Sequence, residues 1–362
     1  MRTPAGILAW VLLSALCFSP AAAAVPPAPL QVDLVTDEAD AVLAILTKTA
    51  AGETPAEADW QRLFTTEGYV RLKKREAWLK RDFTDSEFKQ FVLSDELAGR
   101  RDALADTLAR WKQADVNGAA ARALAYLPPG ARIRAKIYPV IKPQTNSFVF
   151  ETTTDPAIFL YLDPEKTATQ FENTLAHELH HIGYSAACAG QAETEEAQGA
   201  SPSLAHVRRW VWAFGEGIAM LAAAGGPDVH PHAASPATDR QRWDHDVAQF
   251  DADLHRVEGF FLDILEGRLV EPDEIEKIAF SFFGVQGPWY TVGWKMAATV
   301  EKAYGRPALF DCLCEPQKLL ATYNRAAQER GRASSDHIAI WSPALLEALK
   351  TNRDLSPGST TP

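Results

Sequence analysis

The feature that most constrains this 362-residue chain is the segment Asn173–Tyr184, which contains the pattern HELHH. Residues four apart lie on the same face of an α-helix, so the imidazoles of His177 and His181 can bind one metal ion. Neutral imidazole is a good zinc ligand, and the adjacent carboxylate of Glu178 can accept a proton from a metal-activated water. The segment therefore predicts a helix that carries two zinc ligands and a general base.

The apolar residues of this segment indicate a helix with two distinct faces. Four of them fall within an arc of about 80° around a helix axis: Phe171, Leu175, Leu179 and Ile182. His177 and His181 lie on a separate arc. His180, as the i+3 partner of His177, remains an alternative ligand, although the usual pattern favours His181. A solvated helix with a coincidental pair of histidines is the competing interpretation.

A catalytic zinc site needs a third protein ligand and an open fourth position. The extended pattern HExxHxxGxxH is excluded, because Tyr184 and Ala187 stand where it requires Gly and His. The other common solution is a glutamate from a later helix, and Glu216 lies in the apolar stretch WAFGEGIAML. A lone acid in so apolar a run needs a partner, since burying an unpaired charge is costly. Glu216 is the expected third ligand, with a surface carboxylate as the alternative.

Two glycines, Gly215 and Gly217, flank Glu216 in the chain. Glycine inside a helix costs roughly 1 kcal/mol relative to alanine, so a pair of them suggests a packing requirement. We expect the glycines to allow a close approach of this helix to the histidine helix.

The motifs HELHHIGY and GEGIAML together resemble the gluzincin group of zinc metallopeptidases. They are also similar to a bacterial family of uncharacterised proteins described as zinc-dependent peptidases. The resemblance covers about residues 148–304. It implies a zincin-like domain, one Zn²⁺ per chain held by His177, His181 and Glu216, and Glu178 as the general base. The chain departs from the thermolysin-like pattern because no Asp follows the ligand glutamate, so the group that orients a ligand histidine must come from elsewhere.

The stretch Pro288–Gly305 is predicted to be a helix with Tyr290 near its start. In gluzincins a later Tyr or His donates a hydrogen bond to the developing oxyanion, and by this resemblance Tyr290 is the catalytic candidate. An aromatic core residue is the alternative, and Lys295, His230 or His232 can serve in its place. Further possible ligands lie in stretches expected to be loops: Asp228, His230 and His232 in residues 228–242, and Glu193, Glu195 and Glu196 in residues 186–204.

Residues 1–24 read as a secretory signal with an apolar core, Ile7–Phe18, that is too short to span a bilayer. Leu16 precedes Cys17, which argues against a lipoprotein signal. We therefore expect an exported protein, periplasmic or extracellular, with no membrane span in the mature chain. The net charge of −11 argues against general nucleic-acid binding, so the expected partner is a peptide or protein substrate.

Three cysteines remain in the mature chain, and an odd number leaves at least one unpaired thiol. Cys312 and Cys314 are too close in the chain for a comfortable disulfide. A bridge from Cys188 to either of them is open.

A change of period at the segment Pro128–Gly130 divides the chain. Residues 25–128 are predicted to form a helical subdomain, with helices that start near Asp37, Thr54 and Thr84 and at Leu97. The basic run around Arg71 to Arg75 is expected to be a solvated helix face. The following residues, 129–350, are expected to form a zincin-like domain, and 351–362 a disordered tail.

Three short strands precede the histidine helix: Arg132–Tyr138, Phe148–Phe150 and Ala157–Leu162. Asp163 or Thr167 is expected to cap that helix, and further helices are expected at residues 244–266 and 315–330. The predicted class is α+β, predominantly α-helical. The predicted function is peptide-bond hydrolysis by an exported zinc peptidase. A zinc-binding interaction protein without turnover, or a helical structural protein without metal, is the alternative.

Overall fold

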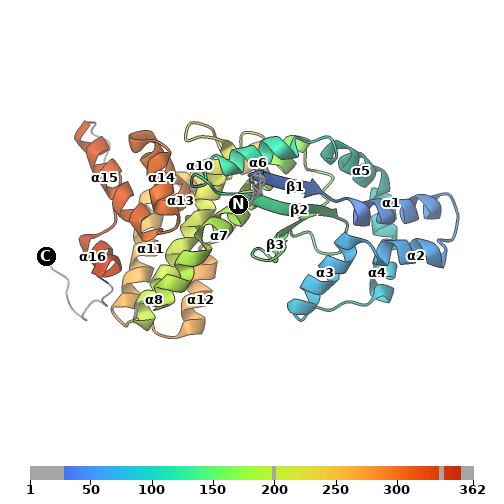
Figure 1. Cartoon of the computed structure of the whole chain (residues 1–362), viewed down its shortest axis with the longest axis horizontal. Helices are drawn as coiled ribbons and strands as arrows, with labels where there is room; N and C mark the ends of the chain where they lie inside the picture. Colours follow the sequence, from blue (N-terminus) through green and yellow to red (C-terminus); the bar gives the residue numbers. More distant parts are fainter. Residues whose placement is uncertain (1–27, 198–200, 334–337, 352–362) are drawn as a thin grey trace, which may run out of the picture.

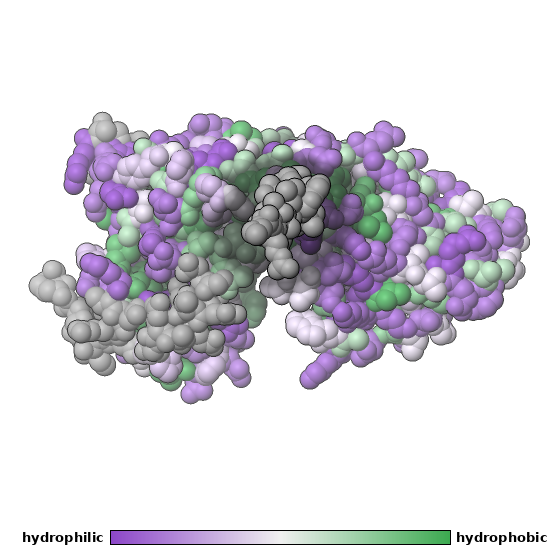
Figure 2. Space-filling view, in the orientation of Figure 1, coloured by the Kyte–Doolittle hydropathy of each residue, from purple (hydrophilic) through white to green (hydrophobic). Residues whose placement is uncertain are grey.

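The computed structural model describes residues 28–197, 201–333 and 338–351. It is predominantly α-helical with one small mixed sheet, which confirms the predicted α+β class. Figure 1 shows an elongated molecule in which the first helices form one end, the sheet lies in the middle and the later helices form the other end. Between the two ends the lower edge of the surface is notched (Figure 2).

The predicted secretory signal and the segment 352–362 of the predicted tail lie outside the described residues. Within the described residues, no helix combines the length and the apolar character needed to cross a membrane.

The N-terminal part contains one strand and a series of short helices. In chain order these are β1 (Leu30–Leu34), α1 (Asp37–Ala50), α2 (Glu57–Phe64), α3 (Glu67–Trp78), α4 (Asp85–Val92), α5 (Asp95–Trp111) and α6 (Val116–Leu124). Thr84 and Glu87 form a capping box that starts α4, as its sequence indicates. The carboxylate of Asp37 accepts a hydrogen bond from the backbone of Glu38 (2.8 Å) in the first turn of α1. It also accepts from the backbone of Glu67 (2.6 Å) and Gly68 (3.3 Å) and so caps α3 as well.

The sheet contains the three predicted strands and β1, which the sequence analysis missed. The strands β2 (Ile133–Val140), β3 (Phe148–Phe150) and β4 (Ala157–Tyr161) combine with β1 in the order β1-β2-β4-β3. The pairs β1–β2 and β2–β4 are parallel, and β3 is an antiparallel edge strand. Because β1 precedes the N-terminal helices and pairs with β2, both sides of residue 128 contribute to one sheet.

The basic run on α3 is only partly the solvated face that was expected, because Lys74 is exposed and Arg71 is not. Arg71 is buried, and its guanidinium contacts Glu151 (2.8 Å) and the carboxylate of Asp155 (3.0 Å). Lys73, Lys74 and Arg75 also pair, with Asp85, Glu151 and Glu76 respectively. The run therefore binds α3 to the neighbouring turn between β3 and β4.

The C-terminal part begins with the long helix α7. The elements are α7 (Ala168–Ala197), α8 (Pro202–Val211), the 3-10 turn η1 (Trp212–Phe214), α9 (Gly215–Ala224), α10 (Ala237–Ala248), α11 (Phe250–Leu265), α12 (Pro272–Ser281), α13 (Pro288–Tyr304), α14 (Pro307–Leu313), α15 (Gln317–Ala333) and α16 (Pro343–Thr351). Two segments predicted to be loops, residues 186–204 and 228–242, are partly helical. Helix α7 continues to Ala197 through good helix formers, and α10 starts at Ala237. The long helix expected from Asp244 is interrupted at Gln249.

One hydrophobic core joins both ends of the molecule. It includes Trp111 of α5, Ile137 of β2, Phe171 of α7 and Trp341 before α16. The rings of Trp111 and Phe171 stack with their centroids 4.4 Å apart. Helix α7 is therefore fixed between the N-terminal helices and the C-terminal helices.

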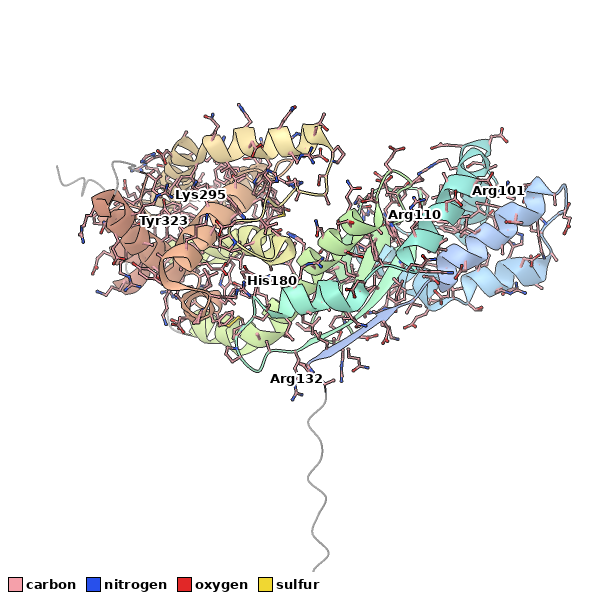
Figure 3. All side chains as sticks on the ribbon, turned by 90° about the horizontal axis from the view of Figure 1, so that it is seen from above. Arg101, Arg110, Arg132, His180, Lys295 and Tyr323 are labelled. Carbon is pink, nitrogen blue, oxygen red and sulfur yellow. A yellow bond between two sulfur atoms is a disulfide. The ribbon has the colours of Figure 1, made fainter. Side chains whose placement is uncertain are left out.

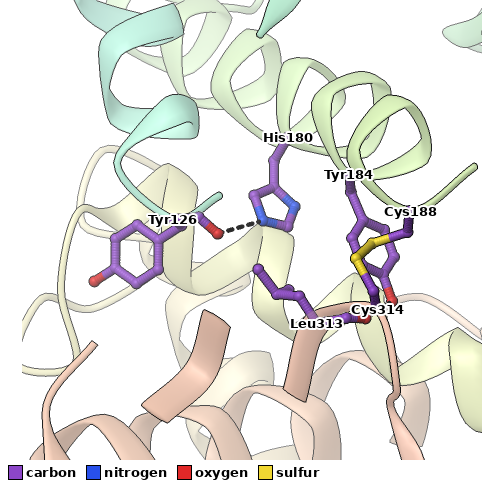
Figure 4. The surroundings of a disulfide bond; sticks show 6 residues. All are labelled: Tyr126, His180, Tyr184, Cys188, Leu313 and Cys314. Carbon is purple, nitrogen blue, oxygen red and sulfur yellow. Dashed lines mark hydrogen bonds between the residues drawn. A yellow bond between two sulfur atoms is a disulfide. The ribbon is translucent and has the colours of Figure 1, made fainter. Parts of the chain in front are cut away.

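A disulfide joins Cys188 of α7 to Cys314 at the end of α14 (Figure 4). Cys312 is buried and unpaired, which agrees with the odd thiol expected from the count. The Tyr184 hydroxyl adds a hydrogen bond to the carbonyl of Leu313 at 2.8 Å. The C-terminal half of the histidine helix is thus covalently attached to the C-terminal helices.

Candidate metal centre

Helix α7 has the two faces that its sequence predicts. Its start is fixed by Thr167, whose hydroxyl accepts from the backbone of Gln170 at 3.2 Å, while the Gln170 side chain accepts from the Thr167 backbone at 2.8 Å. This confirms Thr167 as one of the two expected caps. The apolar stripe is buried: Phe171, Leu175, Leu179 and Ile182. The side chains of His177 and His181 stay 14% and 22% exposed, so both remain partly open to solvent.

The first residue after Gly215 in α9, Glu216, meets both histidines. Its Oε2 lies 3.1 Å from Nε2 of His177 and 3.2 Å from Nε2 of His181, and the two nitrogens are 3.0 Å apart. Ligand atoms at zinc, 2.0–2.1 Å from the ion in tetrahedral geometry, are separated by about 3.3–3.4 Å. The three atoms therefore match three corners of such a tetrahedron within a few tenths of an ångström.

The charges of this cluster favour a cation. Burial opposes ionisation of Glu216, but the facing imidazoles outweigh it and hold the pKa of Glu216 well below 4.5. Burial likewise opposes protonation of His181, yet the Glu216 carboxylate raises the pKa of His181 to about 9. A partly buried set of two imidazoles and one carboxylate thus attracts positive charge strongly. Nitrogen and oxygen donors of this kind suit Zn²⁺.

Two glycines allow α9 to take this position, although not as the sequence suggested. A Cβ on Gly217 would lie 2.0 Å from the backbone nitrogen of Trp294 and 2.6 Å from Cα of Gly293. The close approach of Gly217 is therefore to α13 and not to the histidine helix. Gly215 does face the histidine helix, where a Cβ would lie 3.3 Å from the ring of Tyr184.

Glu178 and Tyr290 lie beside the cluster. Glu178 is half-buried next to His177 on α7. The ring of Tyr290, from the first turn of α13, lies nearly parallel to that of His177 with centroids 6.2 Å apart. Burial, together with the carboxylates of Glu216 and Glu178, raises the pKa of Tyr290 above its usual value. The phenol is therefore protonated, and it forms a hydrogen bond with the Glu216 carboxylate.

Of the three possible ligands expected in residues 228–242, two lie in ion pairs away from the cluster. His230 pairs with Asp244 at 3.1 Å and Asp228 with Lys302 at 2.7 Å. His232 instead lines the same pocket as His177 and Tyr290.

Lys295 is more than half-buried and lies near Arg330, Lys302 and Asp251, on another side of α13 from Tyr290. Among the expected loop acids, Glu193, Glu195 and Glu196 lie at least three turns beyond His181 on α7, and their side chains lie outside the described residues.

His180 points away from the cluster. It is fully buried, and its Nε2 lies 3.4 Å from the carbonyl oxygen of Tyr126, as Figure 4 shows. Burial and the neighbouring histidines lower the pKa of His180 to about 3, so the ring is neutral. It therefore packs α7 against the end of α6, and the i+3 alternative is wrong.

The group that orients a ligand histidine is not found at His177. Its Nδ1 is buried and has no hydrogen-bond partner among the residues that the structure describes. The departure from the thermolysin-like pattern seen in the sequence is thus also a feature of the fold.

A pocket of about 490 Å³ opens in front of His177 and Tyr290. Sequence reasoning missed most of the residues that line it, because they come from four separate segments: Lys166, Gln170, Asn173 and Thr174 before and on α7, Met220 and Ala223 on α9, Pro231, Ser235, Asp239 and Arg242 around the start of α10, and Gly284, Val285 and Gln286 before α13. A local signal existed only for Gln170, Asn173 and Thr174, which precede His177 by 7, 4 and 3 residues.

Comparison with known proteins gives one match. A family model described as "putative zinc dependent peptidase" (DUF5700) matches residues 60–331, which are 272 of the 362 residues. No curated protein and no solved structure matches the chain.

Proposed function

The chain belongs to this family of putative zinc-dependent peptidases, and on that premise we propose that it is an exported, gluzincin-type zinc peptidase that hydrolyses peptide bonds. The observation that carries the proposal is the triangle of His177, His181 and Glu216, whose facing atoms are 3.0–3.2 Å apart. These residues would hold one Zn²⁺ per chain.

The residues around the triangle supply the remaining chemistry. When bound, zinc lowers the pKa of a water and polarises the carbonyl that is attacked. Glu178 accepts the proton of the attacking water and then donates it to the leaving amine. The Tyr290 phenol donates a hydrogen bond to the carbonyl oxygen of the substrate as negative charge develops there. The pocket in front of His177 positions one side of the peptide.

Export is supported by the disulfide. Cys188 and Cys314 are joined, and disulfides persist mainly in oxidising compartments such as the periplasm or the extracellular space. The predicted cleavage after Ala24 would deliver the mature chain there.

The test measures metal content and peptide hydrolysis on the mature chain. We expect about one zinc per chain in the wild type and in Glu178→Gln, and little in Glu216→Ala. Glu178→Gln should reduce the turnover of a cleaved peptide at least about 100-fold, because it removes the general base but no ligand.

Three results would contradict the proposal in different ways. Absence of zinc from the wild type would refute the assignment of the metal site. Full turnover by zinc-loaded Glu178→Gln would refute the assignment of Glu178 as the general base. Bound zinc without turnover of any peptide favours a zinc-binding interaction protein on the same fold.

A further inference from the structure

The pocket in front of the metal centre has a local charge opposite to that of the whole chain. The chain carries a net charge of −11, yet two cationic side chains, Lys166 and Arg242, line the pocket with a single acidic one, Asp239. Burial lowers the pKa of the lining His232, so this imidazole adds no positive charge at neutral pH. A net positive pocket in an acidic protein attracts anionic groups.

Both cations are available to a ligand. Neither Lys166 nor Arg242 forms an ion pair within the described residues, and Asp239 forms none either. Other cations near the sheet differ in this respect, since Arg71 and Lys74 are paired with Glu151. Lys166 precedes α7 and Arg242 lies on α10, so the two approach the pocket from different walls.

The wall formed by α7 leads to the reaction centre. Gln170, Asn173, Thr174 and His177 have helical spacings of 3, 4 and 7 and so share one face. The side chains of Asn173 and Thr174 make no hydrogen bond within the described part of the chain. From Gln170 to His177 the helix rises about 10 Å, the length of about three residues of an extended peptide. A peptide along this face would find amide and hydroxyl partners, with Lys166 beyond them.

Other residues that line the pocket are apolar, and one of them precedes a residue with an unusual backbone conformation. Val285 is 69% exposed at the pocket, and Met220 and Ala223 line it from α9. The next residue, Gln286, has φ +69°, a left-handed conformation that is uncommon for a non-glycine residue. The pocket therefore combines apolar lining residues with a polar face of α7 and two cations that form no ion pair within the described residues.

We propose that this pocket binds a carboxylate of the peptide substrate within about three residues of the bond that is cleaved. The carboxylate is either an acidic side chain or the C-terminus of the peptide, and Arg242 and Lys166 bind it. This specificity rests on the proposed peptidase function.

The test measures binding separately from catalysis. Zinc-loaded Glu178→Gln retains the ligands but lacks the base, so peptides bind to it without being cleaved. The probes are octapeptides of alanine and glutamine with an amidated C-terminus and an N-terminal fluorophore of zero net charge. One series replaces a single Gln by Glu at each position, and one peptide has a free C-terminal carboxylate. Fluorescence polarisation gives each dissociation constant.

One carboxylate-bearing peptide should bind at least about tenfold more tightly than the neutral peptide, and which one it is distinguishes a side chain from a C-terminus. The ratio of the dissociation constants of the neutral and the carboxylate-bearing peptide should approach one in Arg242→Gln and in Lys166→Gln. Arg242→Glu should instead favour a lysine-containing peptide. Raising the salt concentration should reduce the ratio, because the pocket is open to solvent.

Arg101→Gln is the matched control, because it removes an equal charge at the far N-terminal end of the molecule (Figure 3), where Arg101 pairs only with Asp102 among the described residues. It should keep the wild-type ratio.

The proposal is overturned if acidic and neutral peptides bind equally, if no peptide binds, or if the double variant Lys166→Gln/Arg242→Gln keeps the ratio. None of these results depends on turnover. Failure of the peptidase function would instead appear as missing zinc or missing hydrolysis in the wild-type chain.

Discussion

The close contact of α9 with α13 leads to a quantitative prediction for Gly217→Ala. The added Cβ would lie 2.0 Å from the backbone nitrogen of Trp294, whereas such contacts are hardly ever shorter than 3.0 Å. Backbone cannot rotate away as a side chain can. The two helices must therefore separate by about 1 Å, and Glu216, the neighbouring residue, moves with α9.

Two effects set the size of the change in stability. Overpacking costs about 1–3 kcal/mol, and a contact with backbone belongs at the upper end of that range. Alanine in place of glycine within a helix stabilises the folded state by about 1 kcal/mol. The net loss is about 2 kcal/mol, or a fall in the melting temperature of roughly 3 °C for a chain of this size.

The same shift should weaken the metal site. Ligand positions must hold to about 0.2 Å, so a displacement of Glu216 by about 1 Å should lower zinc affinity at least about tenfold. The measurements are thermal unfolding of the chain without metal and zinc affinity by competition with a chelator.

Gly259→Ala is the matched control, since Gly259 lies within α11 and no neighbouring atom comes within 4 Å of the position that its Cβ would occupy. This variant should gain up to about 1 kcal/mol and keep its zinc affinity. If Gly217→Ala behaved like Gly259→Ala in both measurements, the argument that this glycine sets the position of Glu216 would be refuted.

Three further predictions concern pH, the disulfide and the metal. Burial raises the pKa of Glu38 from 4.5 to about 8, so its stabilising effect is full below pH 4.5 and is lost as the pH rises through 8. Glu38→Gln should reduce the loss of unfolding free energy between pH 5 and pH 9 by about 4 kcal/mol in denaturant titrations, and an unchanged pH profile would contradict this. Cys188→Ser should lower the free energy of unfolding by about 2–5 kcal/mol, and reductant should no longer change that free energy. In Cys312→Ala, reductant should still lower it. Equal responses to reductant in the two variants would argue against the Cys188–Cys314 pair. Zinc at 100 times its dissociation constant should stabilise the wild type by about 2.7 kcal/mol and chelator should remove this gain, while Glu216→Ala should show neither effect in thermal scans.

Local sequence signals predicted much of the structure around the centre. The start of α4 follows from Thr84 and Glu87, because the side chain of each accepts a hydrogen bond from the backbone N–H of the other within one turn. The two faces of α7 follow from the spacing of its apolar residues and its histidines, because both arise from the geometry of one helix. The strands after Pro128–Gly130 were predictable for the same reason: the first alternates, and Ala157–Leu162 is a compact apolar run, and both patterns are properties of neighbouring residues.

Features that depend on distant partners were not predictable in this way. Strand β1 has five residues, and its place in the sheet is set by pairing with β2, about 100 residues later. Asp37 caps α3 as well as the first turn of its own helix, because the backbone nitrogen of Glu67 lies 2.6 Å from its carboxylate. The extension of α7 past residue 186 was missed because Gly and Glu in that stretch also suit a loop.

By itself, then, the sequence determined which groups one face of one helix presents: the two histidines and Glu178 lie within five residues of chain. Only the tertiary structure decided which atoms meet that face. It brings Glu216 to 3.1–3.2 Å from both histidines through the contact of Gly217 with α13, and Tyr290 next to His177. It also joins Cys188 to Cys314 and assembles one pocket from four segments. The physical reason is that helix periodicity acts over a few residues, whereas these arrangements depend on the packing of elements far apart in the chain.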